Sequence, residues 1–158
     1  MPPPVDEMMA ALGEWESFLD YKKPMPMLIK VGIEHAHFET IHPFLDGNGR
    51  VGRLLITFLL VENGVLTRPL LYLSHFFKKH RQTYYDLLQA VRDEGAWEMW
   101  LKFFLRGVAE VAAEATDTAR RIVAMREEHR ALVTGNLGGL RVAPSPFWKG
   151  STSGRSST

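Results

Sequence analysis

Cysteine is absent from this chain of 158 residues. Its absence excludes disulfides, thiolate metal sites and a cysteine nucleophile, and it fits a reducing cytoplasm. An excess of charge of one sign is also missing, because 19 basic and 18 acidic side chains leave a net charge of +1. This balance argues against a strongly electrostatic binder of nucleic acid or of membrane surfaces. We therefore expect a cytoplasmic protein.

Long hydrophobic runs are missing as well. The longest, residues 54–61, is interrupted by Thr57 and is far too short to span a bilayer. The N-terminal sequence MPPPVDEMM lacks a basic region followed by an apolar stretch, so it is not a signal peptide. What remains is an ordinary globular composition, 46% hydrophobic and 23% charged, in a length typical of one domain. We expect no contact with membranes.

Hydrophobic residues recur at helical spacing along most of the chain, which predicts an all-α fold. The expected helices span residues 5–20, 28–41, 51–62, 74–92 and 97–133. Asn63 and Gly64 are good stop residues for the third helix, and Ser74 can cap the fourth. The second half of the last segment, residues 112–130, is more polar, so a separate helix there is an alternative to one continuous helix.

Aromatic residues at helical spacing near the start of the last segment are predicted to be core: Trp97, Trp100, Phe103 and Phe104. Burial in a homodimer face is the alternative for the same residues. From residue 135 the composition changes to a stretch without acidic residues, and we expect residues 135–158 to be a disordered tail. Its three basic residues are too few to predict nucleic-acid binding.

The segment HPFLDGNGR at residues 42–50 is a loop by composition and leads into a predicted helix. Gly47 and Gly49 allow backbone conformations that other residues disfavour, and they let a ligand approach the main chain closely. The N–H groups at a helix N-terminus point outward, and the helix dipole favours negative charge there. Together these features predict a phosphate-binding site.

Charged side chains around this loop predict how a polyphosphate is held. Arg50 and Arg53 project from one side of the first helical turn, and their planar guanidiniums suit phosphate oxygens. Asp46 is the expected Mg²⁺ ligand, with phosphates and waters at the other positions. His42 is the expected base, because a histidine can accept a proton from an attacking hydroxyl near neutral pH. The set predicts phosphoryl or nucleotidyl transfer.

Other residues in and before the loop have structural interpretations. Phe44 is expected to pack inward and pin the loop to the core, and Asn48 to hydrogen-bond either the loop or a phosphate oxygen. A metal cluster of His35, His37 and His42 is conceivable, but positions two apart on a helix do not face each other. We therefore expect His35 to be a core histidine.

Residues 42–53, HPFLDGNGRVGR, match the Fic-domain signature HxFx(D/E)GNGRxxR at every specified position. With its fixed positions each about one in twenty, a chance match in this chain is on the order of 10⁻⁸. The surrounding sequence also resembles the family: PPP before the first helix, FETI before the motif, RPLLYLS after it, and the pair Tyr84-Tyr85. The likeness covers roughly residues 2–135.

The resemblance implies an all-helical catalytic domain over residues 1–134 that transfers AMP from ATP to a Ser, Thr or Tyr hydroxyl of a target protein, self-modification included. By analogy His42 would be the base and Asp46 the Mg²⁺ ligand. Arg50 would hold the α- and β-phosphates and Arg53 the terminal phosphate. The full set of nucleotide-binding residues would be Phe44, Gly47, Asn48, Gly49, Arg50, Arg53, Tyr84 and Tyr85.

The sequence departs from the family's pattern at three points. Tyr84 and Tyr85 match a pair that borders the adenine pocket in some members, but Arg92 stands where those members carry an asparagine, so the nucleobase is not fixed. The family's upstream β-hairpin flap is not found. No Glu-Gly or Glu-Asn pair has Ser or Thr four residues before it, so the inhibitory signature (S/T)xxxE(G/N) is missing. We expect either that the chain is a truncated fragment or that a partner protein supplies the inhibition in trans.

Two other functions stay open from the sequence. The same site could transfer another nucleotide or phosphate-containing group, or remove AMP from a modified protein. The chain could instead be a regulatory or toxin-system module in which nucleotide occupancy controls partner contact and turnover is incidental. The intact GNGRxxR favours a nucleoside triphosphate that is attacked at its α-phosphate.

Overall fold

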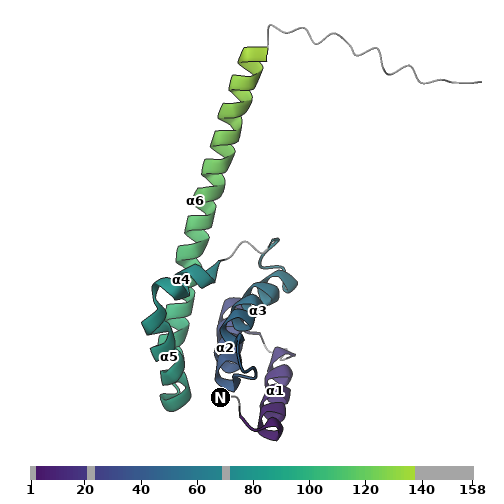
Figure 1. The fold of residues 1–158 in the computed structure, drawn as a ribbon, viewed down its shortest axis with the longest axis vertical. Helices are drawn as coiled ribbons and strands as arrows, with labels where there is room; N and C mark the ends of the chain where they lie inside the picture. The colour runs from purple at the N-terminus through teal and green to yellow at the C-terminus, as the bar shows by residue number, and fades with distance from the viewer. Residues whose placement is uncertain (1–2, 21–23, 69–71, 138–158) are drawn as a thin grey trace, which may run out of the picture. The chain divides into compact units, whose positions relative to one another are not determined.

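The computed structural model describes residues 3–20, 24–68 and 72–137, and none of these residues lies in a strand. The described helices are α1 (Val5–Leu19), α2 (Met27–Ile41), α3 (Asn48–Glu62), α4 (Leu73–Lys79), α5 (Arg81–Glu94) and α6 (Trp97–Leu137) (Figure 1). The predicted all-α fold is confirmed. The chain divides into two compact units, Met1–Thr118 and Ala119–Thr158. No helix among the described residues is both long and apolar enough to cross a bilayer.

Two helix boundaries differ from the sequence prediction. Helix α3 begins at Asn48 rather than at residue 51, because the turn at Gly47 (φ 92°) lets the glycine-rich segment itself form the first helical turn. The helix expected over residues 74–92 is broken at His80 (φ −112°, ψ 38°). Residues seven apart on a straight helix lie about 10 Å apart along its axis, whereas the bend brings the ring centroids of Phe77 and Tyr84 to 4.6 Å.

Helix α6 continues through residues 112–130 without interruption, so the separate helix left open by the sequence does not form. It ends at Leu137, and the first three residues of the predicted tail are therefore helical. Residues 138–158 of that tail lie outside the described part of the chain. The predicted disorder of those residues stays a prediction.

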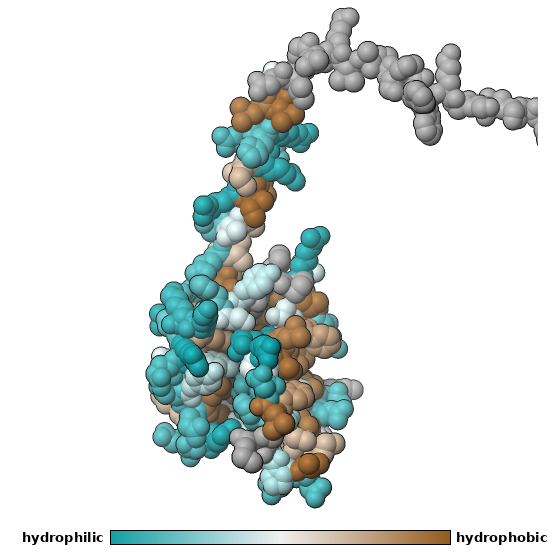
Figure 2. All heavy atoms as spheres, viewed as in Figure 1, coloured by the Kyte–Doolittle hydropathy of each residue, from teal (hydrophilic) through white to brown (hydrophobic). Residues whose placement is uncertain are grey.

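Helix α2 is the central element of the first unit, because it packs against α1, α3 and α5. The indole N–H of Trp100 on α6 donates to the Gly32 carbonyl of α2 at 2.8 Å. Trp100 and Phe104 are fully buried, and Trp97 and Phe103 pack against them, which confirms these residues as core. Hydrophobic side chains also gather on the surface over the side of this unit formed by α1 and α3 (Figure 2).

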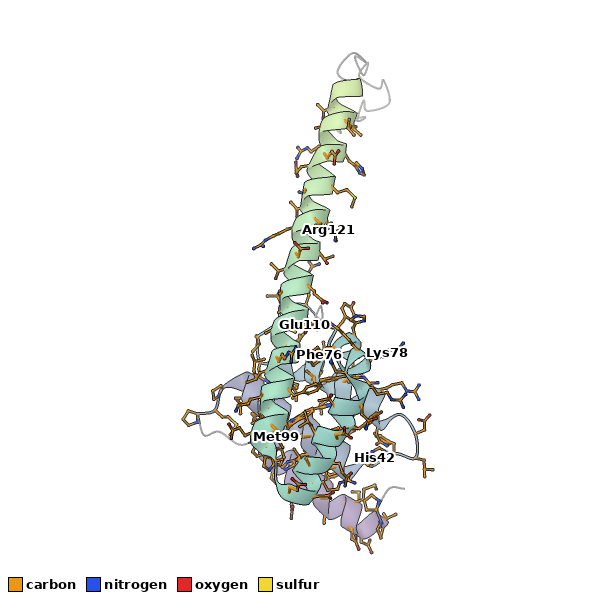
Figure 3. The ribbon with its side chains drawn as sticks, turned by 90° about the vertical axis from the view of Figure 1, so that its left-hand side faces the viewer. His42, Phe76, Lys78, Met99, Glu110 and Arg121 are labelled. Atoms are coloured by element: carbon orange, nitrogen blue, oxygen red, sulfur yellow. The ribbon has the colours of Figure 1, made fainter. Side chains whose placement is uncertain are left out.

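A glycine on α6 makes room for an aromatic ring of α4 and gives a testable prediction. Phe76 lies against α6 (Figure 3), and a Cβ built at Gly107 would be 2.5 Å from its Cδ1. We expect Gly107→Ala to lower the free energy of unfolding by about 1–3 kcal/mol, because the ring is buried among other aromatic side chains and cannot move away freely. Urea titration measures this change.

The matched control is Gly13→Ala on α1, where a Cβ would meet nothing within 4 Å. Since alanine favours helix over glycine by about 1 kcal/mol, this variant should be as stable as the parent or more so. Equal destabilisation at both positions would contradict the packing argument.

Candidate active site

His42 ends α2 and begins the motif loop. Its backbone N–H donates to the Phe38 carbonyl at 3.0 Å, and its backbone is left-handed (φ 52°, ψ 56°). Among the described residues, it is the only non-glycine residue with positive φ. Such conformations are strained and tend to occur at functional sites. Here the turn leaves the imidazole exposed at the surface of the helical body (Figure 3).

The side chain of Asn48 holds the loop in shape. Although it lies in the first turn of α3, it is only 2% exposed. Its Oδ1 accepts from the Phe44 N–H at 2.8 Å, and its Nδ2 donates to the Phe44 carbonyl at 2.5 Å. The sequence predicted that Asn48 would hydrogen-bond either the loop or a phosphate oxygen, and in the structure its side chain hydrogen-bonds the loop.

The prediction that the Phe44 side chain packs inward is wrong. The side chain is 46% exposed, and its ring centroid lies 6.4 Å from that of Phe38. The loop is pinned through the backbone of Phe44, to which Asn48 makes two hydrogen bonds, rather than through burial of the ring. An aromatic ring therefore stands at the surface beside the motif.

The N-terminus of α3 provides the predicted anion position. Gly47 precedes the helix with a φ of 92°, which side chains disfavour, and its own N–H donates to Asp46 Oδ1 at 2.7 Å. The N–H groups of Asn48 and Gly49 lie in the first turn of the helix, where backbone N–H groups have no acceptor within the helix. These donors and the positive end of the helix dipole favour an anion at this point.

The guanidiniums of the two motif arginines lie over the motif glycines. A Cβ at Gly47 would be 3.5 Å from Arg50 Nη2, and one at Gly49 would be 2.9 Å from Arg53 Nη1. A side chain at Gly49 would therefore displace the Arg53 guanidinium. The two arginines line one pocket of about 310 Å³ between α3 and α4, together with Leu54, Thr57, Tyr72, Leu73 and Ser74. The structure thus brings together the two predicted phosphate ligands.

Asp46 and Arg50 form an ion pair at 3.1 Å, and their side chains are 92% and 75% exposed. Such an exposed pair contributes little stability and can be exchanged for other partners. No group of three or more His, Cys, Asp or Glu in the described part of the chain could hold a metal ion, which argues against the cluster of His35, His37 and His42. A single exposed carboxylate fits Mg²⁺ that takes most of its ligands from phosphates and water.

His35 is a core histidine, as predicted. It is fully buried, with Nδ1 3.0 Å from the Gly52 carbonyl and Nε2 2.9 Å from the Tyr84 hydroxyl. Because the carbonyl can only accept, Nδ1–H donates to it and Nε2 accepts from the Tyr84 O–H. Burial lowers the pKa of His35 to about 4, so the ring is neutral at physiological pH.

The tyrosine pair lies at the edge of the arginine site. Tyr84 is 3% exposed, whereas Tyr85 is 51% exposed with the guanidinium carbon of Arg81 at 5.6 Å from its ring centroid. Both tyrosines and Arg53 line a pocket of about 290 Å³ with Ser74, Phe77, Lys78 and Arg81. Tyr84 therefore belongs to the core and also borders this pocket, whereas Tyr85 is exposed at its edge.

His42 does not line either of these two pockets. It lines a third hollow of about 620 Å³ with Thr40, Ile41 and Arg92, with Glu7 and Ala11 of α1, and with Pro3, which precedes α1. Arg92 Nη2 donates to the Thr40 carbonyl at 2.9 Å, two residues before the expected base. Arg92 thus connects α5 to the end of α2. The sequence showed only that an arginine replaces the asparagine of some family members here, and it did not predict this contact.

Glu39 is a residue of the site that the sequence reasoning passed over. It is 9% exposed, and its Oε1 lies 4.0 Å from His35 Nε2 and has no hydrogen-bond partner. Burial raises its pKa, while the nearby charges of Arg53 and His42 lower it. The available signal was an acid three residues before the motif and four residues after His35, which places it on the same helix face as the expected core histidine.

Residues 1–60, which include the motif, match the family model described as Fic/DOC family. This match places residues 1–60, with the motif, in the Fic/DOC family. A solved Fic family protein from Desulfovibrio desulfuricans is 29% identical with a TM-score of 0.68, and the match covers 75% of this chain and 36% of that one. The Fic fold predicted from the sequence is therefore confirmed.

Curated relatives of this Fic domain include enzymes by name. A protein of Aquifex aeolicus named "Probable protein adenylyltransferase" is 46% identical over 67 residues, 41% of this chain and 20% of its own length. The "Protein adenylyltransferase Fic" of Aedes aegypti is 33% identical over 119 residues, 74% of this chain and 22% of its own length. The chain thus spans about a fifth of the length of these relatives.

Proposed function

We propose that this Fic domain transfers AMP from ATP to a hydroxyl side chain of a target protein. The observation that carries the proposal is the junction of α2 and α3, where an exposed, left-handed His42 precedes a helix start covered by two guanidiniums. This arrangement provides a base and an anion site in one short segment. The names of the curated relatives support the same reaction class.

In the proposed reaction, His42 accepts the proton of a Ser, Thr or Tyr hydroxyl as its oxygen attacks the α-phosphorus. The new P–O bond forms as the bond to the bridging oxygen breaks, so that AMP is transferred and pyrophosphate leaves. The first N–H groups of α3 and the Arg50 guanidinium stabilise the developing negative charge. Arg53 holds the terminal phosphate.

Asp46 is the proposed ligand for Mg²⁺, which neutralises phosphate charge when bound. Its present partner is Arg50, at 3.1 Å, so nucleotide binding would redistribute an existing ion pair rather than uncover a buried group. We place the nucleobase against the exposed ring of Tyr85, because Tyr84 is too deeply buried to stack on a ligand. Tyr84 then supports the floor of that pocket.

The test uses ATP labelled at either the α- or the γ-phosphate, incubated with the chain, Mg²⁺ and a cell lysate. AMP transfer predicts protein label from the α-phosphate alone. Label from the γ-phosphate would overturn the proposal in favour of a kinase-like use of the site. No label with retained ATP binding would favour a nucleotide-binding module with little turnover.

Arg53→Ala separates the roles of the two arginines. If Arg53 holds the terminal phosphate, its loss removes a charge-assisted contact of about 1.5–3 kcal/mol from ATP but not from ADP. We expect ATP to bind about 10- to 100-fold more weakly and ADP to bind nearly as before. Titration calorimetry with both nucleotides measures the difference.

Arg106→Ala on α6 is the matched control, because that arginine lines none of the pockets around the motif. It should change neither affinity. Equal weakening of ATP and ADP by Arg53→Ala would contradict the role given to Arg53.

A further inference from the structure

Another pocket lies at the opposite end of the α2–α3 pair from the motif. It has a volume of about 460 Å³ and is bordered by the last turn of α1, the first half of α2 and the second half of α3. This volume is in the range of small-ligand sites. Leu55 and the 59% exposed ring of Phe58 form part of an apolar wall. Neither residue belongs to the proposed active site.

Glu34 of α2 lines this pocket and is fully buried. Neither its Oε1 nor its Oε2 has a hydrogen-bond partner. Buried carboxyl groups are normally paired, because removing an isolated charge from water is costly. A fully buried acid with two unused oxygens at a pocket is therefore an unfilled acceptor, and nothing in the proposed AMP transfer uses it.

The charges that face the pocket select the sign of a ligand. Among the described residues that line it, four are acids, Glu16 of α1, Asp20 directly after it, Glu34 of α2 and Glu62 of α3, and one is a cation, Lys30. The ammonium group of Lys30 donates to the Leu19 carbonyl. Phosphates and other anions are therefore disfavoured. The described residues also offer no cluster that could hold a metal ion, which leaves an organic cation.

We propose that this pocket binds a guanidinium group carried on an alkyl chain. A guanidinium presents two parallel N–H groups that match both free oxygens of Glu34. It is also more weakly hydrated than an ammonium ion, so it enters a buried site more readily. The alkyl chain would lie along Leu55 and Phe58, as the stems of arginine side chains lie on apolar surfaces.

The protonation of Glu34 makes binding depend on pH. Burial raises the pKa of Glu34 to about 7, and the charge of Lys30 lowers it in part. A guanidinium stays charged at all relevant pH values and pairs with the ionised acid. Affinity should therefore rise as the pH increases to about 7 and level off above it. A neutral ligand would show no such rise.

Titration calorimetry with 1-butylguanidine and with the capped peptide acetyl-Ala-Arg-Ala-amide tests the proposal on the whole chain. Both should bind with saturation at pH 8, and the peptide with citrulline in place of arginine, a neutral isostere, should not. Glu34→Gln should weaken the binding of 1-butylguanidine and of the arginine peptide by about tenfold or more, since it removes a charge-assisted pair. Glu98→Gln, an exposed acid of α6, should leave them unchanged.

Phe58→Ala provides a second variant that leaves the core intact, because the ring is exposed, and it should weaken the same probes severalfold. Equal affinity of the two probes would identify a small guanidine compound as the ligand. Tighter binding of the peptide would identify an arginine side chain of a protein as the ligand. No saturable binding, binding of the citrulline peptide as well, or insensitivity to Glu34→Gln would each overturn the proposal. None of these results depends on AMP transfer.

Discussion

Replacing His42 by alanine should reduce AMP transfer by about 100- to 10,000-fold, the usual contribution of a general base. ATP binding should stay close to that of the parent, because the donors assigned to the phosphates lie on α3 and not on His42. Initial rates with α-labelled ATP, together with calorimetric affinity, separate the two effects. The matched control is His75→Ala, because His75 is also an exposed histidine but lies on α4; this variant should keep full activity.

His42→Gly distinguishes the side chain from the backbone at this position. Because His42 is left-handed, glycine should relieve strain and stabilise the fold, yet activity should be lost as in the alanine variant. Activity in either variant close to that of the parent would contradict the assignment of His42 as base.

As the pH rises, the free energy of unfolding of the parent should fall by about 3 kcal/mol because Glu34 becomes ionised while buried. Glu34→Gln should abolish this loss. Burial raises the pKa of Glu34 to about 7 in the folded chain, from an ordinary value of 4.5 for an exposed glutamate. The folded state therefore binds this proton more tightly than the unfolded state. Its stabilising effect is complete below about pH 4.5 and declines as the pH rises to about 7.

Urea unfolding at pH 5 and at pH 8 measures this dependence. The Glu34→Gln variant should be more stable than the parent at pH 8, because it does not bury a charge. Glu128→Gln, an exposed acid on α6, should retain the parent's pH dependence. A saturating arginine peptide should reduce the parent's loss at pH 8. A Glu34→Gln variant with the parent's pH profile would show that Glu34 is not the group responsible.

The helices and the motif could be predicted because they depend on local sequence. Apolar residues at helical spacing predicted five segments, which cover all six described helices, and the fixed residues of the motif predicted the candidate site. The break at His80 could not be found in this way, since residues 74–92 are periodic throughout. It follows from contacts between residues distant along the helix, such as the stacking of Phe77 on Tyr84.

The details of the site depend on which of several possible partners each side chain takes. Asn48 had two candidate partners, and only its position in α3 selects the Phe44 backbone, which in turn leaves the Phe44 ring exposed. Glu34 looks like an ordinary helix residue in the sequence, and its burial appears only when α1 and α3 pack on α2. A partner that inhibits in trans and a homodimer stay predictions.

The proposed function requires that the motif at residues 42–53 binds the phosphates of a nucleotide together with a magnesium ion. Titration of ATP and Mg²⁺ into the chain by calorimetry tests it most directly, with Arg50→Ala and Asp46→Ala as comparisons. The account predicts saturable heat from one site per chain and clear weakening in both variants. No heat of binding, or binding that both variants leave unchanged, would contradict it.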